Sequence, residues 1–336
     1  MDKKDPTIAS LGEFGLIQSH FAPLCSNKKG ITVGIGDDGA VLAVQPNQEL
    51  VVSTDTLVEH IHFSSNDNPY QLAKKSLRVN LSDLAAMGAN PNWYLLNIAT
   101  PPSTQIEWIN EFARGLKEDG ERYSIVLTGG DTTSSKSGLV ITITVMGTVD
   151  KGRAILRSGA KPGDKIFLSG TLGDSTLGLT YRLGYLKISN HLDAEFLQNR
   201  HLIPEPRVSL GLAILTEKIA HSAIDISDGL IADLKHVCSE SNVGAEVDVD
   251  KIPLSGAATR LLETGGKEIL TQILTGGEDY ELLFTADAAM VDKIASIADK
   301  VGVGVTEIGV VSSGSEVKVL QNGSQLKLDS GGWTHF

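Results

Sequence analysis

Short runs of apolar and β-branched residues predict several strands in the first half of the chain. Residues 31–35 and 50–52 are such runs, and small or polar residues follow each of them. A Pro-Asn turn separates residues 41–44 from the run at 50–52, so we expect these two segments to pair as a hairpin. Residues 139–146 alternate threonine with apolar residues and are too few to cross a bilayer, which predicts another strand.

Apolar residues at helical spacing predict two amphipathic helices between these strands. Asn68 and Pro69 suit the N-cap and the first turn of the first helix, and Gly88 suits its C-cap. A second helix is predicted over residues 104–119. The apolar stripe of the first helix comprises Ala73, Leu77, Leu81 and Leu84.

A segment of hydroxyl and carboxylate side chains follows the strand at residues 50–52. We expect Ser53, Thr54 and Asp55 to lie where that strand ends, a position at which α/β proteins commonly place functional groups. Their hard oxygen atoms suit magnesium better than zinc. Taken alone, the segment fits equally well a turn held by a side-chain hydrogen bond to the backbone.

Two polar residues interrupt the apolar face of the first predicted helix. Asn80 and Asp83 lie three residues apart and therefore point the same way. Burying a carboxylate beside an apolar stripe is costly unless it is paired. Asp83 is either a partly exposed side chain or a metal ligand that faces the aspartates of the predicted hairpin.

Residues 34–39 match the dinucleotide-binding pattern G-x-G-x-x-G, but their context argues against that function. The pattern needs a helix after its glycines, and here another strand-like run follows. Asp37 and Asp38 would also repel a pyrophosphate. With cations present, these two carboxylates can instead hold magnesium ions that carry phosphate groups.

Similar acidic turns recur along the chain. Residues 129–133 form a Gly-Gly-Asp-Thr-Thr segment after a predicted strand, for which a plain hairpin turn is the alternative. Asp225, Ser227 and Asp228 lie at a predicted strand–helix junction, where Asp228 alone could be a helix cap. Residues 276–280 place two carboxylates after paired glycines, next to another predicted strand.

The second half of the chain also offers groups that bind anions. The polar turn at residues 150–153 suggests a boundary between domains 1–150 and 151–336. Arg157 is either a phosphate contact or a solvated surface residue. Residues 170–175 form a glycine-containing loop before a predicted helix, which is a natural anion site.

Composition limits the class of protein. The 336 residues are enough for two domains, and a net charge of −12 argues against a nonspecific nucleic-acid partner. An acidic protein with an anionic substrate needs divalent cations between the two. Cys25 and Cys238 lie far apart without metal-ligand spacing, and residues 1–10 lack the apolar core of a signal peptide. We therefore expect a cytoplasmic protein without a membrane partner.

Several common catalytic patterns are missing from the sequence. It contains no Walker A motif, no protein-kinase catalytic loop, no zinc spacing and no G-x-S-x-G elbow. What remains is a set of acidic and hydroxyl residues on glycine-rich turns in both halves. This set points to nucleotide chemistry that uses several magnesium ions.

Taken together, these segments resemble the thiamine-monophosphate kinase family, within the superfamily of the aminoimidazole-ribonucleotide synthetase. The shared segments span nearly the whole chain in the family's order, and those at 53–62 and 276–282 are the most particular to this kinase. They are residues 12–17, 34–40, 53–63, 79–88, 129–133, 157–164, 223–230, 276–282 and 333–336.

The resemblance implies a two-domain synthetase-like fold of the α+β / α/β class. Its N-terminal α+β domain, residues 1–150, binds ATP and magnesium and forms a homodimer by sheet pairing. Its C-terminal α/β domain covers residues 151–336. The implied reaction moves the γ-phosphoryl group of ATP onto thiamine monophosphate by direct in-line transfer.

The resemblance also assigns roles to single residues. Asp55 and Asp131 are the implied catalytic residues, and His60 is given no role. The implied magnesium ligands are Asp38, Ser53, Thr54, Asp55, Asp83, Asp131, Asp225 and Asp228. The implied ATP contacts are Gly130, Asp131, Arg157 and Ser227. The implied thiamine-phosphate contacts are His62, Glu278 and Trp333, the last on an aromatic tail that either docks on the body or stacks on a substrate ring.

Two other functions are compatible with parts of this pattern. An enzyme of the same superfamily that phosphorylates an amide oxygen would share the acidic turns but not residues 53–62 and 276–282. A nucleotide-binding regulator would bind ATP and magnesium without turnover.

Overall fold

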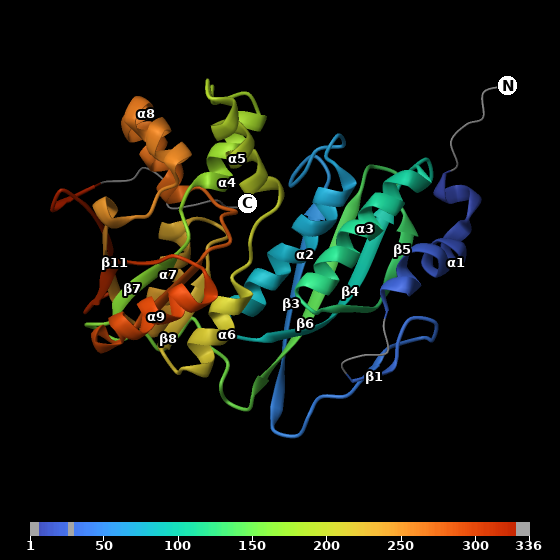
Figure 1. Cartoon of the computed structure of the whole chain (residues 1–336), viewed down its shortest axis with the longest axis horizontal. Helices are drawn as coiled ribbons and strands as arrows, with labels where there is room; N and C mark the ends of the chain where they lie inside the picture. Colours follow the sequence, from blue (N-terminus) through green and yellow to red (C-terminus); the bar gives the residue numbers. More distant parts are fainter. Residues whose placement is uncertain (1–6, 26–29, 327–336) are drawn as a thin grey trace. The chain divides into compact units, whose positions relative to one another are not determined.

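The computed structural model describes residues 7–25 and 30–326, and these residues divide into two compact units. Unit 1 comprises residues up to Leu84 together with Asn90–Gly152, and unit 2 comprises Ala85–Ala89 and the chain from Arg153 onward. Each unit has its own sheet and its own helices (Figure 1).

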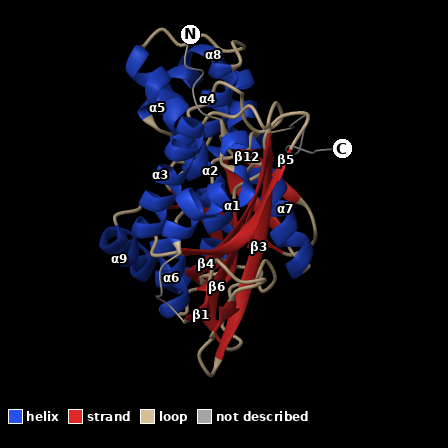
Figure 2. Cartoon of the chain, turned by 90° about the vertical axis from the view of Figure 1, so that its right-hand side faces the viewer, coloured by secondary structure: helices blue, strands red, loops and turns tan. Residues whose placement is uncertain are grey.

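Unit 1 is built on a four-stranded sheet with the strand order β3-β6-β4-β5. Helices α2 and α3 lie on one side of these strands (Figure 2). The strands are β3 (Gln48–Val58), β4 (Asn90–Thr100), β5 (Val126–Ser134) and β6 (Val140–Asp150), and the helices are α2 (Pro69–Ala86) and α3 (Ile106–Arg122).

The predicted helices of unit 1 are confirmed. The stripe residues Ala73, Leu77, Leu81 and Leu84 are completely buried, so they form the face of α2 that packs on the core. Gly88 has φ of 67°, the left-handed conformation of a helix C-cap. Ile109, Phe112 and Leu116 of α3 are equally buried.

The N-terminal part of unit 1 contains short elements. They are α1 (Gly12–Leu16), the π-helical turn η2 (Ile17–Phe21), the 3-10 turns η1 (Ile8–Ser10) and η3 (Ala22–Leu24), β1 (Ile31–Val33) and β2 (Val41–Leu42). The predicted hairpin is wrong, because β2 pairs with β1 and β3 pairs with β6. The strand after the G-x-G-x-x-G segment is confirmed as β2, which supports the rejection of a dinucleotide-binding loop.

Two predicted turns are continuous strands. Strand β3 runs on through Ser53, Thr54 and Asp55 to Val58, so these side chains alternate between the two faces of the sheet. Strand β5 likewise continues through Gly129–Thr133 to Ser134. Threonine has a high β propensity and aligned partner strands supply the ladder, so the polar sequence does not end either strand.

Unit 2 has a seven-stranded sheet with the order β13-β12-β9-β11-β7-β10-β8. Neighbouring strands are antiparallel except for the pair β9 and β12, so this unit has the α+β arrangement. The strands are β7 (Lys165–Ser169), β8 (Ala220–Asp225), β9 (Gly244–Asp248), β10 (Leu282–Ala286), β11 (Val305–Ser312), β12 (Val317–Gln321) and β13 (Ser324–Gln325). Asn322 and Gly323 form the tight turn that joins β12 to β13.

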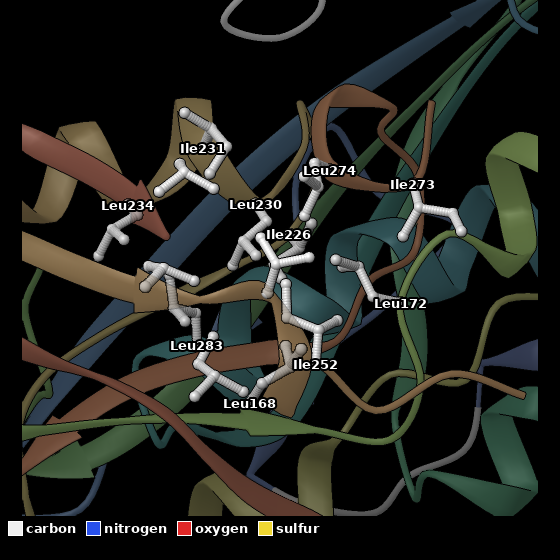
Figure 3. Packing of buried hydrophobic residues seen from close by; sticks show 14 of the residues in the cluster. Leu168, Leu172, Ile226, Leu230, Ile231, Leu234, Ile252, Ile273, Leu274 and Leu283 are labelled. Atoms are coloured by element: carbon white, nitrogen blue, oxygen red, sulfur yellow. The ribbon is translucent and has the colours of Figure 1, made fainter. Parts of the chain in front are cut away.

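Helices of unit 2 surround an apolar core to which the sheet also contributes. Figure 3 shows Ile226 beside Leu230 and Ile252 in this cluster. The helices are α4 (Asp174–Arg182), α5 (His191–Leu202), α6 (Val208–Thr216), α7 (Leu230–Ser241), α8 (Gly256–Thr275) and α9 (Val291–Val301), with 3-10 turns η4 (Val249–Lys251) and η5 (Ala288–Met290). Among the described helices, none combines the length and the hydrophobicity needed to cross a membrane.

Candidate active site

The helix-covered face of unit 1 brings together side chains of β3 and α2. Ser53 Oγ donates a hydrogen bond to Asp83 Oδ2 at 2.6 Å, and Asn80 Oδ1 accepts one from the backbone N–H of Asp55 at 3.0 Å. Since β3 is an edge strand, Asn80 satisfies a backbone donor that no neighbouring strand can reach. The expectation that Asn80 and Asp83 point the same way is confirmed.

The carboxyl groups of Asp55 and Asp83 interact directly. Burial raises the pKa of Asp55 to about 7, and the charge and the hydrogen bond of Asp83 add to the shift. Two carboxylates that meet in a partly buried place repel each other unless a proton or a cation lies between them. Oxygen donors of this kind fit a magnesium ion.

Thr54 lies on the opposite face of the sheet. Its hydroxyl pairs with the Thr144 hydroxyl of β6 at 2.9 Å, and the hydroxyls of Thr56 and Thr142 pair in the same way at 2.8 Å. The alternation of side chains along β3 therefore separates the Thr54 side chain from Asp55 and Asp83.

A cavity of about 640 Å³ in unit 1 brings together two of the predicted acidic segments. Its lining includes the loop that contains Asp37 and Asp38, together with Gly130 and Asp131 of β5. The backbone N–H of Asp38 donates to Asp37 Oδ1 at 2.9 Å, which shapes the loop. Phe14, Ile17, Phe21, Leu95, Leu96 and Leu127 supply apolar walls. A cavity whose lining combines apolar side chains with carboxylates suits a flat ring that carries a charged group.

Gly130 has a structural reason to be glycine. Its φ is 149°, and a Cβ atom at this position would lie 1.8 Å from the carbonyl oxygen of Leu96 on β4. The absence of a side chain at Gly130 therefore allows β5 to approach the neighbouring strand β4 closely.

His62 lies in the turn after β3. Its Nδ1 atom accepts a hydrogen bond from the backbone N–H of Val58 at 3.0 Å, so this contact requires the proton on Nε2. The turn thus fixes both the ring orientation and the tautomer.

In unit 2 the acidic turn follows β8. Asp225 is the last residue of β8 and lies opposite Leu282 of β10. The backbone N–H groups of Ser227, Asp228 and Gly229 all donate to Asp233 Oδ2 at 3.1 Å, so Asp233 holds the turn. Burial raises the pKa of Asp233 to about 7.

The segment that contains Glu278 lies directly beside this turn. The N–H of Glu278 donates to the carbonyl of Ser227, and the N–H of Tyr280 donates to the carbonyl of Ile226, both at 2.8 Å. A Cβ atom on Gly277 would lie 2.1 Å from the Ser227 oxygen. The paired glycines therefore let two segments that are far apart in sequence lie side by side.

Two buried carboxylates anchor this segment. Glu281 accepts from Ser169 Oγ at 2.5 Å, from Arg200 at 2.8 Å and from Arg207 through both nitrogens of its guanidinium edge. Asp279 Oδ2 and Oδ1 accept from the N–H groups of Gly173 and Ser175 at 2.7 and 3.0 Å. Burial raises the pKa of Asp279 to about 7.

Asp279 changes the interpretation of residues 170–175. The backbone N–H groups at the N-terminus of α4 donate to an acidic group of the same chain, the Asp279 carboxyl, rather than to a free anion. We therefore withdraw this loop as a candidate phosphate site.

Two of the remaining predicted residues are Arg157 and Trp333. Arg157 is exposed on a loop of unit 2, and its carbonyl accepts from Ser241 Oγ at 3.2 Å. Trp333 lies outside the described residues. Within residues 7–25 and 30–326, no group of three or more His, Cys, Asp or Glu side chains is arranged to hold a metal ion, so the Asp55–Asp83 pair is a partial ligand set.

The chain matches the family models of two known domains. Residues 36–149 match the family model of the AIR synthase related protein N-terminal domain, and residues 161–321 match that of its C-terminal domain. The chain therefore belongs to the AIR synthase related family.

Full-length relatives narrow the assignment. The chain is 42% identical over 326 residues to the thiamine-monophosphate kinase of Salmonella typhimurium, an alignment that covers 97% of this chain and 98% of that protein. It is 34% identical to the thiamine-monophosphate kinase of Bacillus subtilis, over 97% of this chain and 100% of that protein. A solved structure of AaThiL complexed with AMPPCP and TMP is 33% identical, with a TM-score of 0.76 over 100% of both chains. Within the family, this chain is a member of the thiamine-monophosphate kinases and thus a phosphotransferase.

Proposed function

We propose that this chain transfers the γ-phosphoryl group of ATP to the phosphate of thiamine monophosphate, giving thiamine diphosphate and ADP. The observation that carries the proposal is the full-length match to AaThiL complexed with AMPPCP, which is an ATP analogue, and TMP. The acidic residues of both units supply the chemistry that such a reaction needs.

The main barrier to this reaction is electrostatic. Donor and acceptor are both phosphates, so they repel each other as they approach. The acceptor phosphate is already largely ionised near neutral pH, and a strong general base is therefore unnecessary. We infer direct in-line transfer in which the protein positions the groups and screens their charge.

Magnesium fits the oxygen-rich groups of unit 1. Asp55, Asp83 and the Ser53 hydroxyl would hold it on one face of the sheet, and Asp38 and Asp131 at the cavity. In unit 2, Asp225 and Asp228 are the proposed ligands. When bound, the ions neutralise phosphate charge.

The protein's own groups orient both substrates. Gly130, Asp131 and Ser227 are the proposed contacts of ATP, and the apolar walls of the cavity suit its base. Arg157 is the proposed cation for its phosphates.

The proposed acceptor contacts match the chemistry of thiamine monophosphate. Glu278 offers a carboxylate to its amino group and positive ring, and His62 offers the Nε2 proton of the tautomer that Val58 selects. Trp333 remains a proposed ring contact.

We also propose a homodimer formed through unit 1. The sheet face opposite α2 and α3 carries Leu50 and Val52, which are 44% and 54% exposed. Apolar residues on an edge strand favour pairing with another chain. Burial against a second copy would remove them from water. A cytoplasmic location stays a prediction.

The reaction is tested by mixing the purified chain with ATP, magnesium and thiamine monophosphate. Thiamine diphosphate is detected by chromatography of its fluorescent thiochrome form, and ADP is measured in the same samples. We expect equal amounts of the two products and no product without magnesium. ATP binding without product would reject this acceptor and favour an amide-oxygen substrate, which a panel of amides would then identify.

A further inference from the structure

The segment around Glu278 has an unusual backbone. Glu278 has φ of 65° and Tyr280 has φ of 52°, values that favour glycine. Two non-glycine residues in this conformation within three positions cost free energy, and surrounding contacts must hold them. Hydrogen bonds to the carbonyl groups of Ile226 and Ser227 hold the backbone of this segment. The side chains of Asp279 and Glu281 hold it as well, because they accept hydrogen bonds from other parts of unit 2.

The side chain of Glu278 has its own support. His201 Nδ1 lies 3.0 Å from Glu278 Oε2 and 3.2 Å from Ser175 Oγ. The His201 side chain is 6% exposed, whereas that of Glu278 is 24% exposed. A carboxylate only accepts hydrogen bonds, so the contact requires the proton on Nδ1 of His201.

The position of His201 on α5 is itself fixed. The preceding residue, Arg200, donates to Glu281 Oε1 at 2.8 Å. Consecutive residues of the last turn of α5 therefore hold Glu281 and Glu278, which lie on either side of Asp279. One helix end thus sets the conformation of the whole segment.

We propose that His201 is a positioning residue for the acceptor substrate. Its Nδ1–H group orients the Glu278 carboxylate toward an amino or positively charged group of the acceptor. Without this hydrogen bond the carboxylate is held less firmly in this orientation, and acceptor binding weakens while ATP binding is unaffected. The inference rests on the proposed function.

Four variants test this role. His201→Ala removes the donor, and His201→Asn restores an N–H group near the position of Nδ1. Glu278→Gln removes the carboxylate charge. His191→Ala is the matched control, because His191 lies on the same helix with its side chain 90% exposed.

We expect His201→Ala to raise KM for thiamine monophosphate about tenfold, the size of one charge-assisted hydrogen bond, and to leave KM for ATP nearly unchanged. His201→Asn should recover most of the loss, and His191→Ala should match the wild type. The double variant that combines His201→Ala with Glu278→Gln should have the same KM for thiamine monophosphate as Glu278→Gln alone, because both substitutions remove the same interaction.

Three results would overturn the proposal. One is a wild-type KM for thiamine monophosphate in His201→Ala. Another is an equal rise in both KM values with a lowered Tm that His201→Asn does not rescue, which is the signature of a structural role. The third is full additivity in the double variant.

A separate readout does not need turnover. In NMR spectra, the imidazole nitrogen resonances of His201 should show a proton on Nδ1 in the wild type. These resonances should shift in the Glu278→Gln variant. A His201 ring protonated only at Nε2 would reject the inference. A wild-type protein that forms no thiamine diphosphate would reject the proposed function instead, so the two failures can be told apart.

Discussion

Replacing Gly130 by alanine tests how β5 is held against β4. An alanine Cβ would lie 1.8 Å from the Leu96 carbonyl oxygen and 2.6 Å from its carbon. Contacts below 3.0 Å are essentially never seen for real Cβ atoms. Both contacted atoms belong to backbone, so no rotamer change can relieve the clash.

The magnitude follows from this geometry. Moving the Leu96 carbonyl out of range breaks the β4–β5 ladder hydrogen bonds before and after Gly130 along the strand, and each of them contributes about 1 kcal/mol. The φ of 149° adds strain of about 1–3 kcal/mol for any residue with a Cβ atom. We therefore expect Gly130→Ala to destabilise unit 1 by about 3–5 kcal/mol.

Gly129→Ala is the matched control. Its Cβ atom would meet the Leu95 Cδ2 atom at 3.2 Å, which is the movable end of a side chain. Alanine also restricts the unfolded chain more than glycine does, so we expect a change of about 1 kcal/mol or less.

Urea unfolding followed by tryptophan fluorescence provides the assay. Trp93 and Trp108 both belong to unit 1, and a Trp333→Phe background removes the remaining tryptophan of the chain. A loss of 3 kcal/mol lowers the midpoint by about 1–3 M at the usual slope. Equal midpoints for the alanine variants at positions 129 and 130 would refute the steric argument.

Three further predictions concern the site, the charges and the assembly. Asp55→Asn should lower turnover by orders of magnitude and leave the unfolding midpoint unchanged. Asp150→Asn is the control at an exposed aspartate, and near-normal turnover of Asp55→Asn at saturating magnesium would contradict the role of Asp55. Burial raises the pKa of Asp279 from its usual 3.8 to about 7 in the fold, so its contribution to stability is present at low pH and is lost as the pH rises from about 4 to 7. The difference in unfolding free energy between wild type and Asp279→Asn should therefore fall by up to about 1.4 kcal/mol per pH unit in that window, and a constant difference would contradict the shift. Val52→Lys should convert a dimer into monomers in light scattering, with Lys151→Glu as a charge control outside the strand, and an unchanged mass would exclude this face.

Local sequence signals are sufficient to specify the long helices and the last hairpin. The stripe from Ala73 to Leu84 repeats over three turns, and Asn322-Gly323 requires the backbone of a tight turn. Both signals are complete within a few residues. They need no partner from elsewhere in the chain.

Pairing between distant segments could not be predicted in the same way. Strand β2 pairs with β1 and not with β3. Strand β3 continues past Ser53 because β6 pairs with it along its whole length. The alternation that separates Thr54 from Asp55 appears only once that segment is known to be a strand.

The candidate site shows the same division. Asn80 and Asp83 could be placed together because their spacing is local. His201 belongs to no recognisable sequence motif. Its proposed role depends on a contact with Glu278, which follows α8 in the chain and is therefore far from His201 in sequence. Asp279 and Gly173 lie 106 residues apart, so nothing in residues 170–175 reveals that the helix terminus is already occupied.

The carboxyl group of Asp279 occupies the N-terminus of α4 as a tethered acceptor of its backbone N–H groups. A free anion at this terminus would come and go with its concentration, whereas a side chain of the same molecule has a constant, high local concentration. The backbone of residues 173–175 should therefore keep one conformation over a wide range of nucleotide and phosphate levels. The same tether fixes the residue next to Glu278, so the backbone beside this proposed acceptor contact is held without a bound substrate.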